Sequence, residues 1–207
     1  MKFPRSGLYA ITQTEGKPIA KILVEVEAAL KGGAAVIQYR DKSLQDKLYL
    51  GSRLLQLCRT YQRPLLINDD ILLAQALGAD GVHVGKHDDY IEKARHSLGP
   101  EAIIGISCYN DVGKALEMQA KGADYIAFGR FFPSNSKPLA SPAEIETLHI
   151  AKQKLTKPIV AIGGILPENG TQLLAAGADL LAVIGGLFDN EPESAARSYQ
   201  QLFNQTQ

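Results

Sequence analysis

A row of polar and charged residues follows the apolar run at residues 34–37, and it reads Gln38-Tyr39-Arg40-Asp41-Lys42. If the run is a β-strand, alternation places Gln38, Arg40 and Lys42 on one face at its carboxyl end. Arginine offers a planar fork of donors, lysine a compact positive charge and glutamine a neutral donor, and this combination suits a polyanion. A strand that runs into a charged, solvated turn has a similar composition. The choice between the two interpretations therefore depends on the rest of the chain.

Two pairs of acidic residues follow later apolar runs, at Asp69-Asp70 and at Asp88-Asp89. Carboxylates on neighbouring strand ends could share one Mg²⁺, which takes one or two protein carboxylates together with phosphate oxygens and water. Aspartate is also a common N-cap of helices. We expect Asp70 and Asp89 to cap helices, and Asp69 and Asp88 to bind Mg²⁺.

Two pairs of glycines, Gly163-Gly164 and Gly185-Gly186, end the last two apolar runs. Glycine lets backbone N–H groups approach phosphate oxygens, and the last two strands of α/β barrels often carry a phosphate site. The glycines could instead form tight turns. A segment with hydroxyl groups and a lysine, residues 129–138, precedes them. The pattern predicts a phosphate monoester here and a metal-bound diphosphate near Arg40 and Lys42.

The elements that would position these residues repeat along the chain. Four apolar runs are each led by a glycine, and three of them contain Gly-Ala-Asp; the four are residues 33–37, 78–85, 122–129 and 177–185. Four further apolar runs lie at residues 7–12, 64–69, 103–107 and 158–164. Segments of helical period separate the runs, as at residues 19–30, 44–61, 115–120 and 192–203. Strands that are apolar on both faces and alternate with helices indicate a parallel sheet covered by helices.

We therefore predict an α/β fold, a single (β/α)₈ TIM barrel with its site at the carboxyl ends of the strands. A doubly wound open sheet is the alternative. The chain of 207 residues is expected to form one domain, residues 1–207, because no linker divides it.

The composition narrows the kinds of partner. Twenty-two basic residues balance twenty-two acidic ones, which argues against nucleic acid or a membrane surface. Cys58 and Cys108 are too few for a disulfide framework or a zinc cluster, and no run of eighteen apolar residues occurs. We expect a cytoplasmic protein that acts on small phosphorylated molecules, and the sequence leaves its oligomeric state open.

The chain resembles the thiamine phosphate synthase family along nearly its whole length. The resemblance rests on six ordered motifs: Gln38-Tyr39-Arg40-Asp41-Lys42, Asn68-Asp69-Asp70, Gly81-Val82-His83-Val84-Gly85 with Asp88, Gly105-Ile106-Ser107, Phe132-Pro133-Ser134-Asn135-Ser136-Lys137, and Gly163-Gly164-Ile165. Six motifs in order form a specific signal, whereas one alone would be weak. The resemblance implies that 4-amino-2-methyl-5-hydroxymethylpyrimidine diphosphate is joined to 4-methyl-5-(2-hydroxyethyl)thiazole phosphate, giving thiamine phosphate and diphosphate.

The resemblance also implies roles for individual residues. Asp69 and Asp88 would bind Mg²⁺. The pyrimidine diphosphate would contact Gln38, Arg40, Lys42, Asn68, Ser107 and Lys137, of which the catalytic ones are expected to be Arg40, Lys42, Ser107 and Lys137. The thiazole phosphate would contact Ser134, Ser136, Gly164, Ile184 and Gly185.

The implied mechanism needs no strong base. Cleavage of the carbon–oxygen bond would leave a pyrimidine methylene cation, which the thiazole nitrogen captures, so positioning and electrostatics would carry the rate. His83 is expected to pack or to support other residues. The sequence departs from the family at Lys86-His87, at Cys108-Tyr109, and in having serine for threonine at residues 134 and 136. Two alternatives remain: a thiazole tautomerase of the same fold, and a non-catalytic binder of thiamine precursors.

Overall fold

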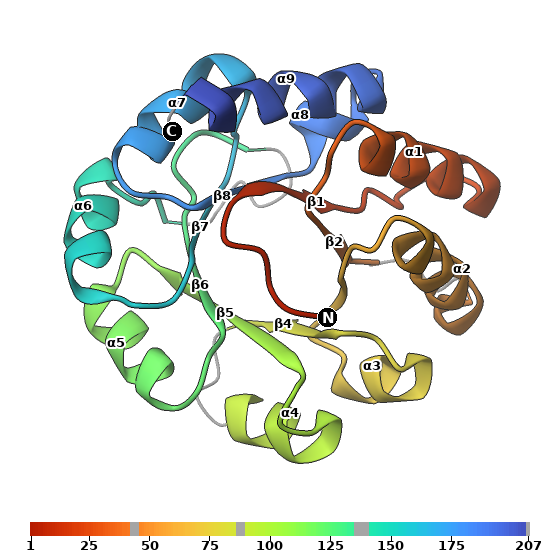
Figure 1. Cartoon of the computed structure of the whole chain (residues 1–207), viewed down its shortest axis with the longest axis horizontal. Helices are drawn as coiled ribbons and strands as arrows, with labels where there is room; N and C mark the ends of the chain where they lie inside the picture. Colours follow the sequence, from red (N-terminus) through yellow and green to blue (C-terminus); the bar gives the residue numbers. More distant parts are fainter. Residues whose placement is uncertain (42–45, 86–89, 135–140, 206–207) are drawn as a thin grey trace.

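The computed structural model describes residues 1–41, 46–85, 90–134 and 141–205, and these form a closed barrel of parallel strands surrounded by helices (Figure 1). The strands are β1 (Gly7–Ile11), β2 (Val36–Tyr39), β3 (Leu65–Asn68), β4 (Gly81–Val84), β5 (Ile103–Tyr109), β6 (Tyr125–Phe128), β7 (Ile159–Ile162) and β8 (Leu180–Val183). The helices are α1 (Ile19–Lys31), α2 (Lys47–Thr60), α3 (Ile71–Leu77), α4 (Tyr90–Leu98), α5 (Val112–Ala120), α6 (Ile145–Lys154), α7 (Pro167–Ala175), α8 (Gly185–Phe188) and α9 (Pro192–Gln205). Strand β1 pairs with both β2 and β8. The predicted TIM barrel is confirmed, and the open sheet is excluded.

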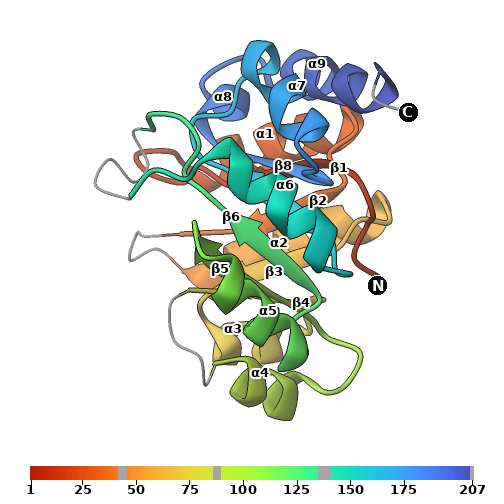
Figure 2. The ribbon, with the colours of Figure 1, turned by 90° about the vertical axis from the view of Figure 1, so that its left-hand side faces the viewer.

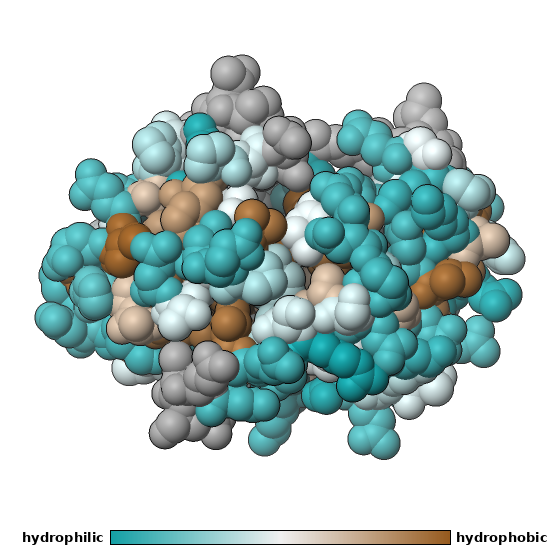
Figure 3. Space-filling model, turned by 90° about the horizontal axis from the view of Figure 1, so that it is seen from above, coloured by the Kyte–Doolittle hydropathy of each residue, from teal (hydrophilic) through white to brown (hydrophobic). Residues whose placement is uncertain are grey.

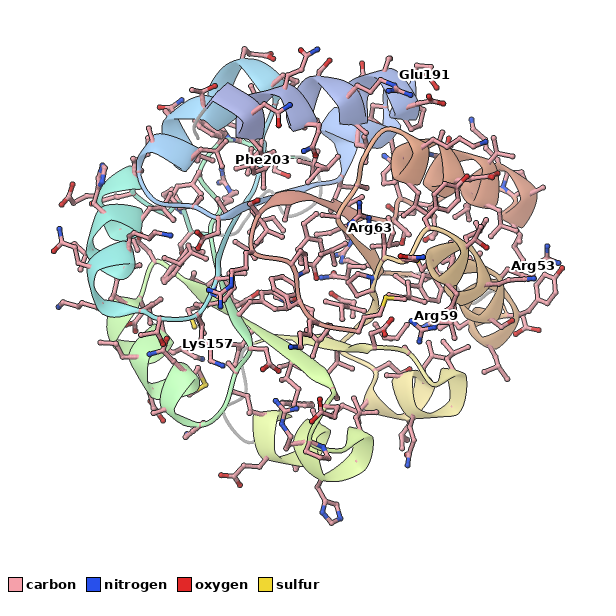
Figure 4. All side chains as sticks on the ribbon, in the orientation of Figure 1. Arg53, Arg59, Arg63, Lys157, Glu191 and Phe203 are labelled. Carbon is pink, nitrogen blue, oxygen red and sulfur yellow. The ribbon has the colours of Figure 1, made fainter. Side chains whose placement is uncertain are left out.

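The core has two layers because side chains alternate along each strand. One cluster fills the barrel interior and includes Tyr9, Leu66 and Tyr125. The larger cluster lies between barrel and helices, and Figure 4 shows Phe203 reaching into this layer from α9. Each fully buried large apolar side chain stabilises the fold by about 1.5–3 kcal/mol. The two layers together make the barrel a packed core with its polar groups at the strand ends.

The Gly-Ala-Asp repeat has a structural role at the amino ends of the strands. Each aspartate precedes an even-numbered strand and forms two hydrogen bonds with one residue of the strand before it. The backbone N–H of the aspartate donates to that residue's carbonyl, and the carboxylate accepts from that residue's N–H. These bonds measure 2.7–3.0 Å and join Asp80 to Leu65, Asp124 to Ile104, and Asp179 to Ile159.

Each of these aspartates also pairs with a cation on an even-numbered helix. The pairs are Asp80 with Arg59 of α2 at 2.8 Å, Asp124 with Arg95 of α4 at 2.9 Å, and Asp179 with Lys152 of α6 at 2.5 Å. Figure 4 shows Arg59 between α2 and the barrel. In the first strand pair Ala35 takes the place of the aspartate, and only the backbone bond to Leu8 remains. The two-unit period of the sequence thus corresponds to a repeated connection that holds strand pairs together.

Aspartate N-caps set where several helices begin. The carboxylates of Asp46, Asp70 and Asp111 accept backbone N–H groups at the starts of α2, α3 and α5. The cap at Asp70 confirms its expected role. Helix α5 begins at Val112, earlier than the predicted start at residue 115, because the apolar pattern missed the capped first turn. Helix α2 begins at Lys47 rather than at residue 44, because Asp46 caps its first turn and so ends the apolar pattern's extension towards the N-terminus.

The first residues of the chain cross the amino end of the barrel (Figure 1), and Figure 2 shows the N-terminus on the side opposite the strand arrowheads. Phe3 stacks on Tyr125 with ring centroids 4.1 Å apart and meets Tyr9 edge-on at 6.3 Å. This aromatic cluster closes the amino end, so the site must lie at the carboxyl end. The face seen in Figure 3 is mainly hydrophilic, with small separate apolar areas. No helix among the described residues is long and apolar enough to cross a membrane.

Candidate active site

A cavity of about 610 Å³ lies at the carboxyl ends of the strands, and all eight strands or the loops that follow them contribute to its wall. This size suits a small ligand. Every predicted site residue within the described part of the chain lines the cavity: Gln38, Arg40, Asn68, Asp69, Ser107, Ser134, Gly164, Ile184 and Gly185. The remaining predicted residues, Lys42, Asp88, Ser136 and Lys137, lie outside the described residues, as do Lys86, His87 and Asp89.

The end of β2 presents Gln38 and Arg40 to the cavity, as alternation requires. Thr12, which follows β1, bonds both the N–H and the carbonyl of Arg40 at 2.9 Å and so fixes the backbone beside the guanidinium. On the opposite face, Tyr39 is buried in the helix layer, and its hydroxyl donates to Asp41 at 3.1 Å. The acidic residue of the motif is therefore held away from Gln38 and Arg40.

The end of β3 places a carboxylate beside this cation. Asp69 has a φ of +61°, in the left-handed region that aspartate tolerates better than most residues. Its side chain is exposed and accepts a hydrogen bond from Asn68 Nδ2 at 2.7 Å. Asp69 Oδ1 lies close to Gly85 at the end of β4, so the carboxylate sits between the ends of β3 and β4. No cluster of three or more metal-ligating side chains occurs among the described residues.

The opposite wall is built from glycines and backbone. Gly163 and Gly164 have φ values of +105° and +62°, and a Cβ on Gly164 would lie 2.2 Å from the carbonyl oxygen of Pro133. Only glycine lets the loops after β6 and β7 pack this closely. Gly185 begins the short helix α8, whose first N–H groups have no partner within the helix. Tyr199 of α9 donates to the carbonyl of Ile165 at 2.9 Å and anchors the loop after β7.

The floor of the cavity holds two tyrosines, Tyr9 and Tyr125, that the sequence reasoning missed. The hydroxyls of Tyr9 and Tyr125 lie 2.7 Å apart, and Gln38 Nε2 donates to Tyr9 at 2.8 Å. His83 contacts Tyr125 through Nδ1 at 2.8 Å and Ser107 through Nε2 at 2.9 Å. We call these five residues the Gln38–Ser107 chain. Burial raises the pKa of both phenols well above the ordinary value, so both keep their protons.

Other residues at the cavity also escaped the sequence reasoning. Arg130 follows β6, and Gln13 donates to Asp189 at 2.8 Å at the rim, on the side of the neighbouring strands β1 and β8. Tyr109, one of the departures from the family pattern, lines the cavity at the end of β5. The sequence offered a signal for these residues, because they lie at the carboxyl ends of strands or in the segments that follow them.

Neither Cys58 nor Cys108 is among the described residues that line the cavity. Both are buried free thiols, and burial raises the pKa of Cys58 to about 12. Cys58 packs in the core as a small buried hydrophobe.

A closed parallel barrel with cations, a carboxylate and glycine loops around one cavity at the carboxyl ends of its strands defines a TIM-barrel enzyme. The profile of the thiamine monophosphate synthase family matches residues 8–187. The chain belongs to this family, and it is a transferase.

Similar proteins cover almost the whole chain. Thiamine-phosphate synthase of Nitrosococcus oceani is 51% identical over 200 residues, which cover 95% of this chain and 92% of that protein. The enzyme of the same name from Methylococcus capsulatus is 49% identical over 207 residues, with 99% and 92% covered. The solved structure of thiamine phosphate pyrophosphorylase from Pyrococcus furiosus has a TM-score of 0.87 at 34% identity, with 98% and 97% covered.

Proposed function

We propose that this chain condenses 4-amino-2-methyl-5-hydroxymethylpyrimidine diphosphate with 4-methyl-5-(2-hydroxyethyl)thiazole phosphate, releasing thiamine phosphate and diphosphate. The observation that carries the proposal is one cavity with two walls of different chemistry, each suited to an anion. Arg40, Asn68 and Asp69 form one wall, and the glycine loops after β7 and β8 form the other. Two walls of this kind suit two phosphorylated substrates that must meet.

The first wall suits the diphosphate. Arg40 brings a fixed fork of donors, while Gln38 and Asn68 bring neutral amides. In the proposed site Lys42 and Lys137, which lie outside the described residues, add two more charges. These groups stabilise the leaving diphosphate more as its bond breaks, since negative charge accumulates on it in the transition state.

Asp69 fits the role of a Mg²⁺ ligand, which we propose it shares with Asp88. Its carboxylate is exposed, has no ion-pair partner among the described residues and lies at the rim shared with Arg40. Hard carboxylate oxygens are the protein ligands that Mg²⁺ prefers. When bound, Mg²⁺ would neutralise charge on the departing diphosphate.

The second wall suits the thiazole phosphate. Backbone N–H groups around Gly164, Ile184 and Gly185 lie where glycine permits close approach, and a phosphate at this place is common in TIM barrels. We propose that the hydroxyls of Ser134 and Ser136 complete this side.

In the proposed reaction the carbon–oxygen bond of the pyrimidine diphosphate breaks, and its electron pair leaves with the diphosphate. The lone pair of the thiazole nitrogen then forms the new carbon–nitrogen bond, which transfers the positive charge to the thiazolium ring. The chain's residues hold both partners in line and exclude water from the cation. No residue has to remove a proton from carbon or to form a covalent bond.

The test is direct. The protein is incubated with both substrates and Mg²⁺, and thiamine phosphate and diphosphate are quantified by chromatography. We expect the two products in equal amounts. Reactions that lack one substrate or contain a chelator serve as controls. Absence of both products refutes the synthase proposal: binding without turnover then supports the precursor binder, and isomerisation of a thiazole carboxylate supports the tautomerase. We also propose that the protein works in the cytoplasm, where its two buried thiols stay reduced.

A further inference from the structure

The Gln38–Ser107 chain links five polar groups from five strands across the barrel interior. Its contacts run from Gln38 to Tyr9, Tyr125, His83 and Ser107, with lengths of 2.7–2.9 Å. Tyr9 and Tyr125 are almost completely buried, whereas Ser107 is partly exposed at the cavity. The chain therefore runs through the barrel interior and ends at Ser107, which is partly exposed in the cavity.

The chain has a direction, because one end of it can only donate. An amide NH₂ has no acceptor capacity, so Gln38 Nε2 donates a hydrogen bond to the oxygen of Tyr9. Tyr9 finds a partner for its own hydroxyl proton if it donates to Tyr125, and Tyr125 then donates to the other group in its reach, His83 Nδ1. In this order the ring proton of His83 lies on Nε2 and is donated to Ser107, whose own hydroxyl proton then points into the cavity.

The surroundings keep this order intact. Phe3 stacks on Tyr125 from the amino end, and Tyr125 is fully buried, so bulk water does not compete for its hydroxyl. The ring of Tyr125 lies against β5 where a Cβ on Gly105 would come within 1.8 Å of Cζ. A glycine on the neighbouring strand is thus required for the phenol to reach His83. No buried side-chain polar atom among the described residues lacks a partner.

We propose that Tyr9 and Tyr125 are positioning residues that act through His83 to aim the hydroxyl proton of Ser107 at an anionic oxygen of the bound diphosphate group. The identity of this ligand rests on the proposed function. With the reverse direction, Ser107 would donate to His83 and would present only lone pairs to an anion, which would weaken binding. The direction of the chain therefore decides whether Ser107 attracts or repels the ligand.

The direction is tested first, without any ligand or turnover. In protein labelled with ¹⁵N-histidine, the ring of His83 is assigned by comparison with the His83→Gln variant. We expect an unprotonated Nδ1 and a protonated Nε2, and a changed pattern in Tyr125→Phe. A proton on Nδ1 in the native protein overturns the proposal.

The coupling to Ser107 is tested by the affinity for inorganic diphosphate with Mg²⁺, measured by calorimetry. Ser107→Ala and Tyr125→Phe are each expected to weaken binding roughly 10-fold, the scale of one lost hydrogen bond to a charged group. The double variant should bind no more weakly than Ser107→Ala, because Tyr125 acts only through Ser107. If the affinity losses of the two single variants multiply in the double variant, Tyr125 has a merely structural role and the proposal is overturned.

Two further variants sharpen the result. His83→Gln keeps an N–H donor near the position of Nε2 and should bind diphosphate better than His83→Leu. Tyr61→Phe removes a hydroxyl that donates to Glu27 outside the barrel, at 3.0 Å, and should bind like the native protein. If diphosphate binding follows these expectations but no thiamine phosphate forms, the proposed function fails and the positioning role stands. If thiamine phosphate forms but Tyr125→Phe binds diphosphate normally, the positioning role alone fails.

Discussion

Replacing Asp80 by alanine should destabilise the barrel more than the same change at the equivalent Asp179. The carboxylate of Asp80 is only 2% exposed and accepts the buried N–H of Leu65 at 2.9 Å. Its removal leaves that N–H without an acceptor, which costs about 1–3 kcal/mol. Arg59 is 43% exposed and can turn to water, so its lost ion pair adds no more than about 1 kcal/mol.

We therefore expect Asp80→Ala to lower the free energy of unfolding by about 3 kcal/mol. Asp179 is 22% exposed, so water can reach the N–H of Ile159 in its variant, and the expected loss is about 1–2 kcal/mol. Asp80→Asn keeps an acceptor for Leu65 and should lose less than Asp80→Ala.

Urea unfolding followed by circular dichroism measures all three variants, with a lower midpoint at an unchanged slope as the sign of lost stability. Thermal unfolding should show Asp80→Ala melting about 6–12 °C below the native protein. Equal losses in the alanine variants of Asp80 and Asp179, or a loss below about 1 kcal/mol at Asp80, would refute the reasoning that burial of the carboxylate sets the cost.

Three further predictions concern the cavity and a core thiol. Lys42→Ala and Asp69→Ala should each lower turnover by roughly 10²–10³ with the fold intact, and full activity in steady-state assays of both variants would remove their assigned roles. Gly164→Ala forces a Cβ against the carbonyl of Pro133 at 2.2 Å and should raise the KM for the thiazole phosphate, whereas an unchanged KM would argue against a phosphate there. Because burial raises the pKa of Cys58 to about 12, its thiol stays protonated at pH 8 and should resist iodoacetamide until urea is added, as mass spectrometry of the labelled peptides would reveal.

The barrel could be predicted because its repeat is visible in the sequence. Apolar runs led by Gly-Ala-Asp mark the even-numbered strands from β4 onward, and their aspartates form the same hydrogen bonds in the structure. The positions of Gln38, Arg40 and Asp69 at one cavity could be predicted as well, because the carboxyl ends of parallel strands meet.

The two tyrosines at the floor of the cavity could not be predicted in this way. Tyr9 and Tyr125 read as core residues of apolar strands, and 116 positions separate them in the sequence. Their hydroxyls meet only because the barrel closes, which no local pattern encodes. Gly105 was noted within a motif, but its reason, space for the ring of Tyr125, needs the neighbouring strand.

The aromatic cluster of Phe3, Tyr9 and Tyr125 has a consequence for molecular traffic. It closes the amino end, so among the described residues the cavity opens only at the carboxyl end of the barrel. In the proposed reaction two substrates and two products would pass this one opening, so the partner that lies against Ser107 and His83 would bind before the other and leave after it.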